Sequence, residues 1–189
     1  MDYSALAEQV RGLGAYKAGV VDLQDVRFDR AFRAMCETNA CGNYGKCWMC
    51  PPDAGDIDAL MNEAQSYQKA LVYQTVGTLE DSYDFEGMME AAHRHSQLSQ
   101  QIGQLCGQLP GSPLHLGAGG CHVCAVCAKA SNEPCRHPEQ MRYSIEALGG
   151  DVSFATKRYF QKELLWGSGG MAPAYQMLVG GLLLPPEKR

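Results

Sequence analysis

The sequence predicts a single α/β domain spanning residues 1–189, in which helices flank a mixed sheet of about four strands. Strand-like and helix-like patterns alternate along the chain, and no repeat, linker or low-complexity tract divides it. With 46% hydrophobic and 20% charged residues, the chain can bury a full core of its own. Most of the nine cysteines fall in two loops between predicted elements. We therefore expect one compact domain carrying two cysteine-rich loops.

Apolar spacing and capping residues predict the elements of the N-terminal half. Asp25 can cap a helix whose apolar residues recur at spacings of four and three, so that they share one buried face. Asp56 can cap the next helix in the same way. The elements predicted here are a helix over residues 3–13, a strand over 17–23, a helix through 28–35, a helix over 57–64 and a strand over 69–76.

The C-terminal half is predicted to begin with a long amphipathic helix that ends before Pro110 and Gly111. A short strand then runs into the sequence Gly117-Ala-Gly-Gly, which places the second cysteine group just beyond a strand end, where α/β folds usually hold their sites. The elements predicted here are helices over residues 88–109, 139–147 and 154–164 and strands over 114–116 and 174–184.

The downstream cysteine group has the most informative spacing in the chain. Three cysteines follow each other with two intervening residues, and a fourth follows after seven more; these are Cys121, Cys124, Cys127 and Cys135. Such a run can wrap one corner of an iron–sulfur cubane, and the later cysteine can return to the fourth iron. A structural zinc site would more often show two separate Cys-x-x-Cys pairs. The spacing therefore favours a [4Fe–4S] cluster.

The upstream cysteine group forms a second candidate site. Its members are Cys36, Cys41, Cys47 and Cys50. Gly42 and Gly45 permit positive φ values, and two prolines follow Cys50, so the segment is predicted to be a loop. Either all four thiolates saturate a cluster, or Cys47 is a bystander and three thiolates leave one iron open to a ligand. The spacing leaves both alternatives open.

Two ordered motifs carry a resemblance to a known family. The first is Cys36-x4-Cys41-Gly-x-Tyr-x3-Trp-x-Cys50-Pro-Pro, and the second is the downstream run from Gly117 with its continuation to about residue 155. Over residues 30 to 155 the chain resembles the uncharacterised cysteine-rich family of predicted metal-binding proteins of bacteria and archaea. The resemblance implies metal binding and matches Cys36, Cys41 and Cys50, whereas the position of Cys47 is not a regular cysteine in that family.

These patterns predict two [4Fe–4S] clusters and a role in electron transfer, as a carrier or redox subunit with a protein partner. The alternative is an enzyme acting on a small molecule at a cluster with an open iron, for which Glu37, Lys46 or Asp53 could handle protons. A zinc-binding structural module is the third reading. Whether the chain forms a homodimer stays open.

Composition and sequence patterns limit the classes of partner that we expect for this protein. The net charge of −5 and the lack of a basic, aromatic cluster argue against nucleic acid. No apolar run reaches the length of a membrane span. An odd cysteine count and an N-terminus without an export pattern favour free thiols and a cytoplasmic location.

Several single residues have expected environments. Cys106 is expected to be a buried structural thiol, and His93 and His95 are expected to be solvated. The residues expected to lie beside the cluster are His122, Arg136 and His137.

Overall fold

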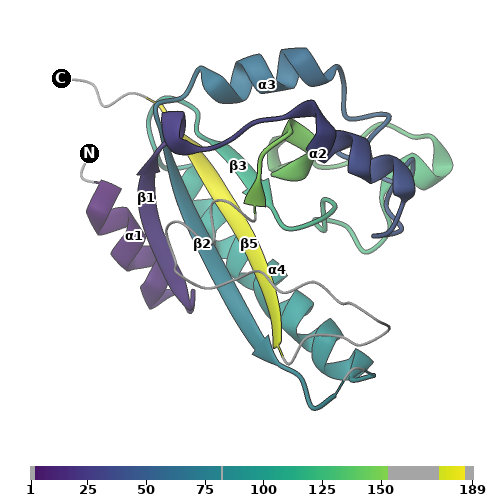
Figure 1. Ribbon diagram of the computed structural model, residues 1–189, viewed down its shortest axis with the longest axis horizontal. Helices are drawn as coiled ribbons and strands as arrows, with labels where there is room; N and C mark the ends of the chain where they lie inside the picture. The colour runs from purple at the N-terminus through teal and green to yellow at the C-terminus, as the bar shows by residue number, and fades with distance from the viewer. Residues whose placement is uncertain (1–2, 82, 153–174, 186–189) are drawn as a thin grey trace.

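The computed structural model describes residues 3–81, 83–152 and 175–185. They form one α/β unit around a five-stranded sheet with the strand order β1-β2-β5-β3-β4 (Figure 1). Every pair of neighbouring strands is antiparallel except β3 and β4, which are parallel. The strands are β1 (Lys17–Asp22), β2 (Lys69–Thr78), β3 (Leu114–Gly117), β4 (Tyr143–Ser144) and β5 (Tyr175–Leu184). The prediction of a mixed sheet is confirmed; the strand beyond the four predicted is β4, which has only two residues.

Four α-helices accompany the sheet in the described part of the chain, and they lie on both of its faces. Buried side chains of α1 and α4 pack against one face, and those of α3 pack against the other. The helices are α1 (Tyr3–Gly12), α2 (Arg30–Ala34), α3 (Ile57–Gln65) and α4 (Phe85–Cys106). The fold is therefore a helix–sheet–helix sandwich, and the remaining helix, α2, leads into the upstream cysteines.

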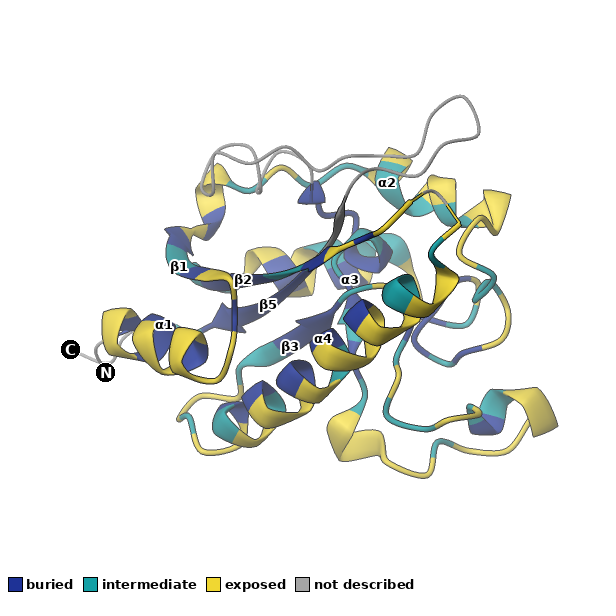
Figure 2. Ribbon diagram, turned by 90° about the horizontal axis from the view of Figure 1, so that it is seen from below, coloured by how far each residue is buried: buried dark blue, intermediate teal, exposed yellow. Residues whose placement is uncertain are grey.

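The central strand β2 shows how the two cores are divided. Leu71 and Tyr73 face α1 and α4, whereas Ala70 and Val72 face α3, as the period of two along a strand requires. Buried and exposed bands alternate along α4 in Figure 2, so this helix lays one apolar stripe on the sheet. Both cores are complete without any of the eight cysteines in the two loops.

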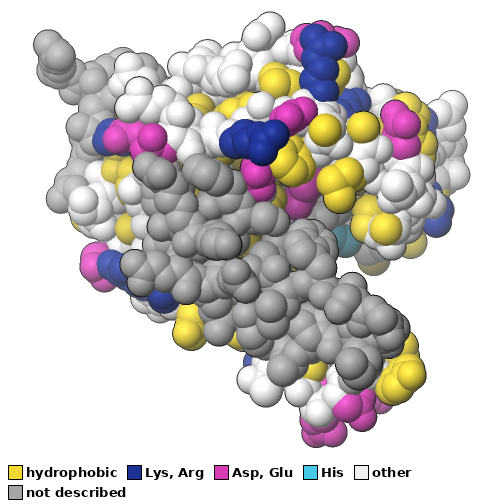
Figure 3. Space-filling model, viewed as in Figure 1, with side chains coloured by type: hydrophobic (Ala, Val, Ile, Leu, Met, Phe, Trp, Pro, Cys, Tyr) yellow, Lys and Arg dark blue, Asp and Glu magenta, His cyan; other side chains and the backbone are white. Residues whose placement is uncertain are grey.

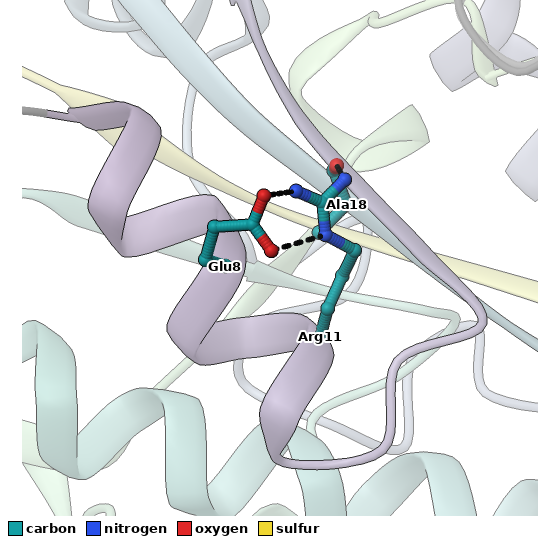
Figure 4. Close-up of polar contacts among 3 residues, drawn as sticks. All are labelled: Glu8, Arg11 and Ala18. Carbon is teal, nitrogen blue, oxygen red and sulfur yellow. Dashed lines mark hydrogen bonds and ion pairs between the residues drawn. The ribbon is translucent and has the colours of Figure 1, made fainter.

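Local polar contacts fix how helices begin and how they dock. The Asp56 side chain accepts hydrogen bonds from the amides of Asp58 and Ala59, which confirms it as a cap. The expected cap at Asp25 is wrong: Asp29 caps α2 by accepting from the amide of Ala31. At α1, the Arg11 guanidinium pairs with Glu8 and also donates to the carbonyl oxygen of Ala18 at 3.4 Å, which ties the helix to β1 (Figure 4).

Two further predictions are wrong, and a third falls on residues that the structure does not describe. The helix expected over residues 139–147 is wrong, since that segment holds two short 3-10 turns separated by β4. Short polar side chains account for the difference, because the Ser144 hydroxyl accepts from the amide of Ala147 and competes with a continuous helix. The helix expected over residues 154–164 lies outside the described residues. His95 was expected to be solvated, but it is only 4% exposed.

No helix in the described ranges combines the length and the apolar character that crossing a membrane requires. On the face shown in Figure 3, the described Lys and Arg side chains are scattered among Asp and Glu side chains and form no continuous basic surface.

Candidate metal centre

The two cysteine segments lie side by side at one end of the sheet. The upstream loop, residues 36–56, follows α2, and the downstream loop, residues 117–142, follows β3 (Figure 1). Lys129 Nζ lies 2.5 Å from Asp53 Oδ1 and 4.3 Å from the centre of the Trp48 ring. Trp48 Nε1 in turn donates to the carbonyl oxygen of Glu133 at 2.9 Å. These contacts join segments that are far apart in the sequence.

Glycines allow this close approach and the turns of the upstream loop. Gly42 and Gly45 have φ values of 74° and 70°, as the sequence predicted for a loop that wraps its own backbone. Gly120 lies against Asn43 of the upstream loop, and a Cβ atom at Gly120 would come within 3.1 Å of the Asn43 amide group. A larger residue at position 120 would therefore require the Asn43 side chain to shift.

One pocket between the loops is lined by five of the nine cysteines. Four of them are the downstream group, and the fifth is Cys47 of the upstream loop. Trp48, Met49 and Met141 supply apolar walls, while Arg136 and His137 supply positively charged or polar edges. All nine cysteines are free thiols. The structure thus assembles the predicted downstream group and adds Cys47 to it.

Cys121 and Cys127 of the downstream group pack against Cys47 and Cys50 of the upstream group, and these contacts shift the pKa values of the thiols. Cys121 donates to Cys47, which raises the pKa of Cys121, and burial raises it further. Cys47 in turn donates to Cys50, and this hydrogen bond lowers the pKa of Cys50. For Cys47 itself, the bond from Cys121 lowers the pKa, but the bond to Cys50 and burial outweigh it. Cys47 is therefore the link between the two groups.

The remaining upstream cysteines form a set close to this link. Negative charge on Cys41, Cys36 and Cys121 acts to raise the pKa of the Cys50 thiol. Burial raises the pKa of Cys36, and the neighbouring carboxylate of Glu146 raises it further. Cys50 is buried, Cys36 is half-buried and Cys41 is exposed, so this set opens toward solvent on one side.

Backbone amides donate to two of the sulfurs. The amides of Val123 and Arg142 donate to the Cys121 sulfur, and the amide of Met49 donates to that of Cys47. The two amides at Cys121 come from a residue shortly after it and from the residue directly before β4. Hydrogen bonds of this kind stabilise negative charge on sulfur, whether the thiolate is free or bound to a metal.

The side chains proposed for proton transfer are not grouped around the thiols. Glu37 and Lys46 are exposed, and Asp53 is held in its ion pair with Lys129. Arg136, expected beside the cluster, lines the five-cysteine pocket and donates to the carbonyl oxygen of Val126. His137 lines the same pocket from an exposed position.

A buried polar network next to the downstream loop was not predicted. Arg142 Nη1 donates to Ser99 Oγ at 2.7 Å, and Ser99 Oγ lies 3.1 Å from the Tyr73 hydroxyl and 3.3 Å from His115 Nε2. One signal was available in the sequence: His95 and Ser99 are spaced by three or four residues from the buried Ala91, Leu98 and Ile102 of the same helix. Arg142 carried no such signal, because its segment was taken for a helix.

Within residues 3–81, 83–152 and 175–185, no three His, Cys, Asp or Glu side chains converge closely enough to hold a single metal ion. The sulfurs are instead distributed around a pocket and along its upstream edge. A family model described as that of a predicted metal-binding protein, DUF2284, matches residues 19–183. The chain belongs to the DUF2284 family. No curated protein and no solved structure matches the chain.

The DUF2284 match extends from β1 to β5 and includes both cysteine loops, so it covers the whole candidate site and confirms the resemblance found in the sequence. It supports metal binding by this protein. Thiolates are the donors preferred by zinc and by iron–sulfur clusters, and the cysteine-lined pocket of this DUF2284 chain fits that chemistry.

Proposed function

We propose that the protein binds two neighbouring [4Fe–4S] clusters and acts in electron transfer, as a carrier or as a redox subunit. The observation that carries the proposal is the packing of Cys121 and Cys127 against the cluster formed by Cys47, Met49 and Cys50, which brings the two cysteine groups together. Two cysteine groups that pack against each other can hold two centres close enough for rapid electron exchange. A cluster bound in each group would supply one-electron redox chemistry.

The residues that would hold the clusters follow from this grouping. Cys121, Cys124, Cys127 and Cys135 would hold the downstream cluster. Cys36, Cys41 and Cys50 would hold the upstream cluster, with Cys47 as its fourth ligand. Since a thiolate rather than a thiol binds iron, loading would release protons from Cys47 and Cys121 in particular.

The surrounding chain would adjust the reduction potential. The amides of Val123 and Arg142 at Cys121, and that of Met49 at Cys47, would raise it by stabilising the more negative reduced state. The exposed Arg136 would act in the same direction through its positive charge, whereas the charge of Lys129 is balanced by Asp53. Trp48 and Met141 would limit the access of water.

A second candidate function is favoured by the position of Cys47. Cys47 belongs to the upstream group but lines the pocket of the downstream group, so it could be a ligand of the downstream cluster instead of the upstream one. The upstream cluster would then be held by Cys36, Cys41 and Cys50 alone and would keep one iron open to a ligand. An open iron is suited to an enzyme that binds a small molecule for reduction or sulfur transfer.

The first test is to measure iron, acid-labile sulfide and zinc per chain in anaerobically purified protein, together with visible and electron paramagnetic resonance spectra before and after dithionite. About eight irons and eight sulfides per chain are expected for two cubane clusters. About one or two zinc ions without sulfide would refute both redox proposals and leave a structural zinc module.

The Cys47→Ser variant then separates the two redox functions, with Cys106→Ser as its matched control. Cys106, the last residue of α4, belongs to the core under α1 and α4, which contains no loop cysteine, and its thiol donates to the carbonyl oxygen of Pro113. Electron transfer between saturated clusters predicts that Cys47→Ser loses about four irons per chain. An unchanged iron content and spectrum would instead support the open-iron enzyme. Cys106→Ser should keep its full iron content in either case.

A further inference from the structure

A second pocket, of about 160 Å³, lies directly beside Cys121. Its lining residues come from α4 and from residues 117–122 at the start of the downstream loop. Arg142, directly before β4, and Leu178 of β5 complete the lining. The polar side chains that line it are those of His95, Ser96, Ser99, His122 and Arg142. This pocket is far smaller than the roughly 300–1,000 Å³ of sites for drug-sized ligands, so only a small molecule fits.

Arg142 gives the pocket a buried positive charge. Its side chain is only 8% exposed, and its Nη1 donates to Ser99 Oγ. In the described part of the chain, no carboxylate lies within ion-pair distance of Arg142. A buried charge without a partner costs several kcal/mol, and an anion in the pocket would remove that cost. The planar guanidinium is suited to binding two oxygens of one anion at once.

His95 supplies a second unused polar group. It is 4% exposed, and its Nδ1 lies 2.9 Å from Thr75 Oγ1. Its Nε2 is buried and has no hydrogen-bond partner among the described residues. When the Thr75 hydroxyl donates to Nδ1, Nε2 carries the proton and can donate to a ligand. A buried donor left unpaired is unfavourable, so this atom also favours an occupied pocket.

The larger groove on the other side of Arg142 is a weaker candidate. It has a volume of about 750 Å³ and is lined by His115 and Arg142. Glu139 lines the same groove and would repel an anion, and none of the eight loop cysteines lines it. The His115 Nε2 atom is already occupied by Tyr73 and Ser99. The smaller pocket therefore combines Arg142 with the unpartnered Nε2 of His95, a residue that does not line the groove.

We propose that the 160 Å³ pocket binds a small oxyanion, either a carboxylate or a tetrahedral phosphorus or sulfur oxyanion, held by Arg142 and His95 beside Cys121. This inference goes beyond the proposed function, because it depends only on side chains of the described chain and not on which metal the cysteines hold. If a redox-active cluster is bound at Cys121, the anion lies next to one of its ligands.

The test is isothermal titration calorimetry of the full-length protein with acetate and with inorganic phosphate, using sodium chloride to match ionic strength. Binding of one anion per chain is expected, and the better probe identifies the planar or the tetrahedral class. Arg142→Gln should weaken the binding at least tenfold. Arg94→Gln is its matched control, since Arg94 is an exposed arginine paired with Glu90 on α4, and it should bind like the unmodified protein.

A second variant tests the pocket without touching the buried charge. Ala92 is exposed on α4 and lines the pocket, so Ala92→Phe should block it while leaving the fold intact. Gln97→Phe places the same side chain at an exposed position of α4 outside the pocket and should leave the affinity unchanged. The proposal is wrong if neither probe binds, or if the control variants weaken binding as much as Arg142→Gln and Ala92→Phe do. Iron content, measured on the same samples, reports on the proposed function separately.

Discussion

Lys129 and Asp53 form an ion pair with an N–O distance of 2.5 Å that joins the two cysteine loops. Their side chains are only 19% and 21% exposed, and the ammonium group also lies over the ring of Trp48. Because the pair is largely withdrawn from solvent, removal of one partner leaves the other charge poorly hydrated. The pair therefore holds the position of each loop against the other.

We expect Lys129→Met to lower the free energy of unfolding by about 1–3 kcal/mol, between the values typical of exposed and buried pairs. Urea denaturation of the variant, and of Asp53→Asn and the double variant, measures the coupling between the two residues. Lys69→Met is the control, because the Lys69–Asp22 pair is 39% and 54% exposed and should contribute less than about 1 kcal/mol. Equal effects at Lys129 and Lys69 would contradict this role.

Gly180 of β5 lies opposite Tyr73 of β2, and a Cβ atom at position 180 would come within 2.3 Å of the Tyr73 hydroxyl. Gly180→Ala should displace Tyr73 from Ser99 and His115 and destabilise the fold by about 2 kcal/mol. Gly181→Ala is a matched control in the same strand, since among the described residues its Cβ would meet only the Leu71 carbonyl oxygen, at 3.4 Å. That variant should change stability by less than about 1 kcal/mol, and thermal denaturation compares the two.

Two buried histidines predict a pH-dependent stability. Burial lowers the pKa of His95 to about 4 and that of His115 to about 3, and the positive charge of Arg142 acts in the same direction on both. The unfolded chain takes up protons near its ordinary pKa of 6.5, whereas the folded chain does not. Their stabilising effect is therefore complete above pH 6.5 and is lost as the pH falls toward 4.

We expect the free energy of unfolding to fall by about 2 kcal/mol as the pH is lowered from 7 to 5.5, because the two histidines take up protons only in the unfolded chain. His115→Gln should remove about half of this dependence in urea denaturation at a series of pH values. His93→Gln, at an exposed position of α4, should keep the dependence of the unmodified protein. A dependence that does not change in His115→Gln would show that other groups cause it.

Metal removal should loosen the loops and spare the sheet. The buried cores on both sheet faces contain no loop cysteine, while Cys47, Met49 and Cys50 form a separate small cluster. Hydrogen exchange of metal-loaded and chelator-treated protein should therefore differ mainly in residues 36–56 and 117–142. Exchange that rises equally in β2 and β5 would mean that the metal is required for the fold itself.

The sheet and most helices could be predicted because their apolar periods are unbroken. Residues 69–76 alternate between the two cores as β2, and the Asp56 cap fixes the start of α3. The segment around residues 139–147 failed because helix-type spacing there is overridden by local hydrogen bonds and by pairing with β3. Such pairing depends on tertiary contacts, which spacing along one segment does not reveal.

The cysteine groups could be predicted as groups but not as neighbours. Spacing fixes which thiols share a loop, and both loops formed where they were expected. The meeting of Cys47 with Cys121 depends on the contacts of Trp48 and Lys129, whose partners are carbonyl and carboxylate oxygens in the opposite loop. His95 was misassigned because a polar residue on a helix was assumed to face water.

Arg142 contacts both the cysteine centre and the neighbouring pocket. Its backbone amide donates to the Cys121 sulfur, and its guanidinium donates to Ser99 in the pocket. A molecule that draws the guanidinium toward itself would also shift the amide at the sulfur. By reciprocity, any change of charge at Cys121 would alter how tightly the pocket holds its occupant. Arg142 would then couple the electronic state of the cysteine centre to the occupancy of the pocket.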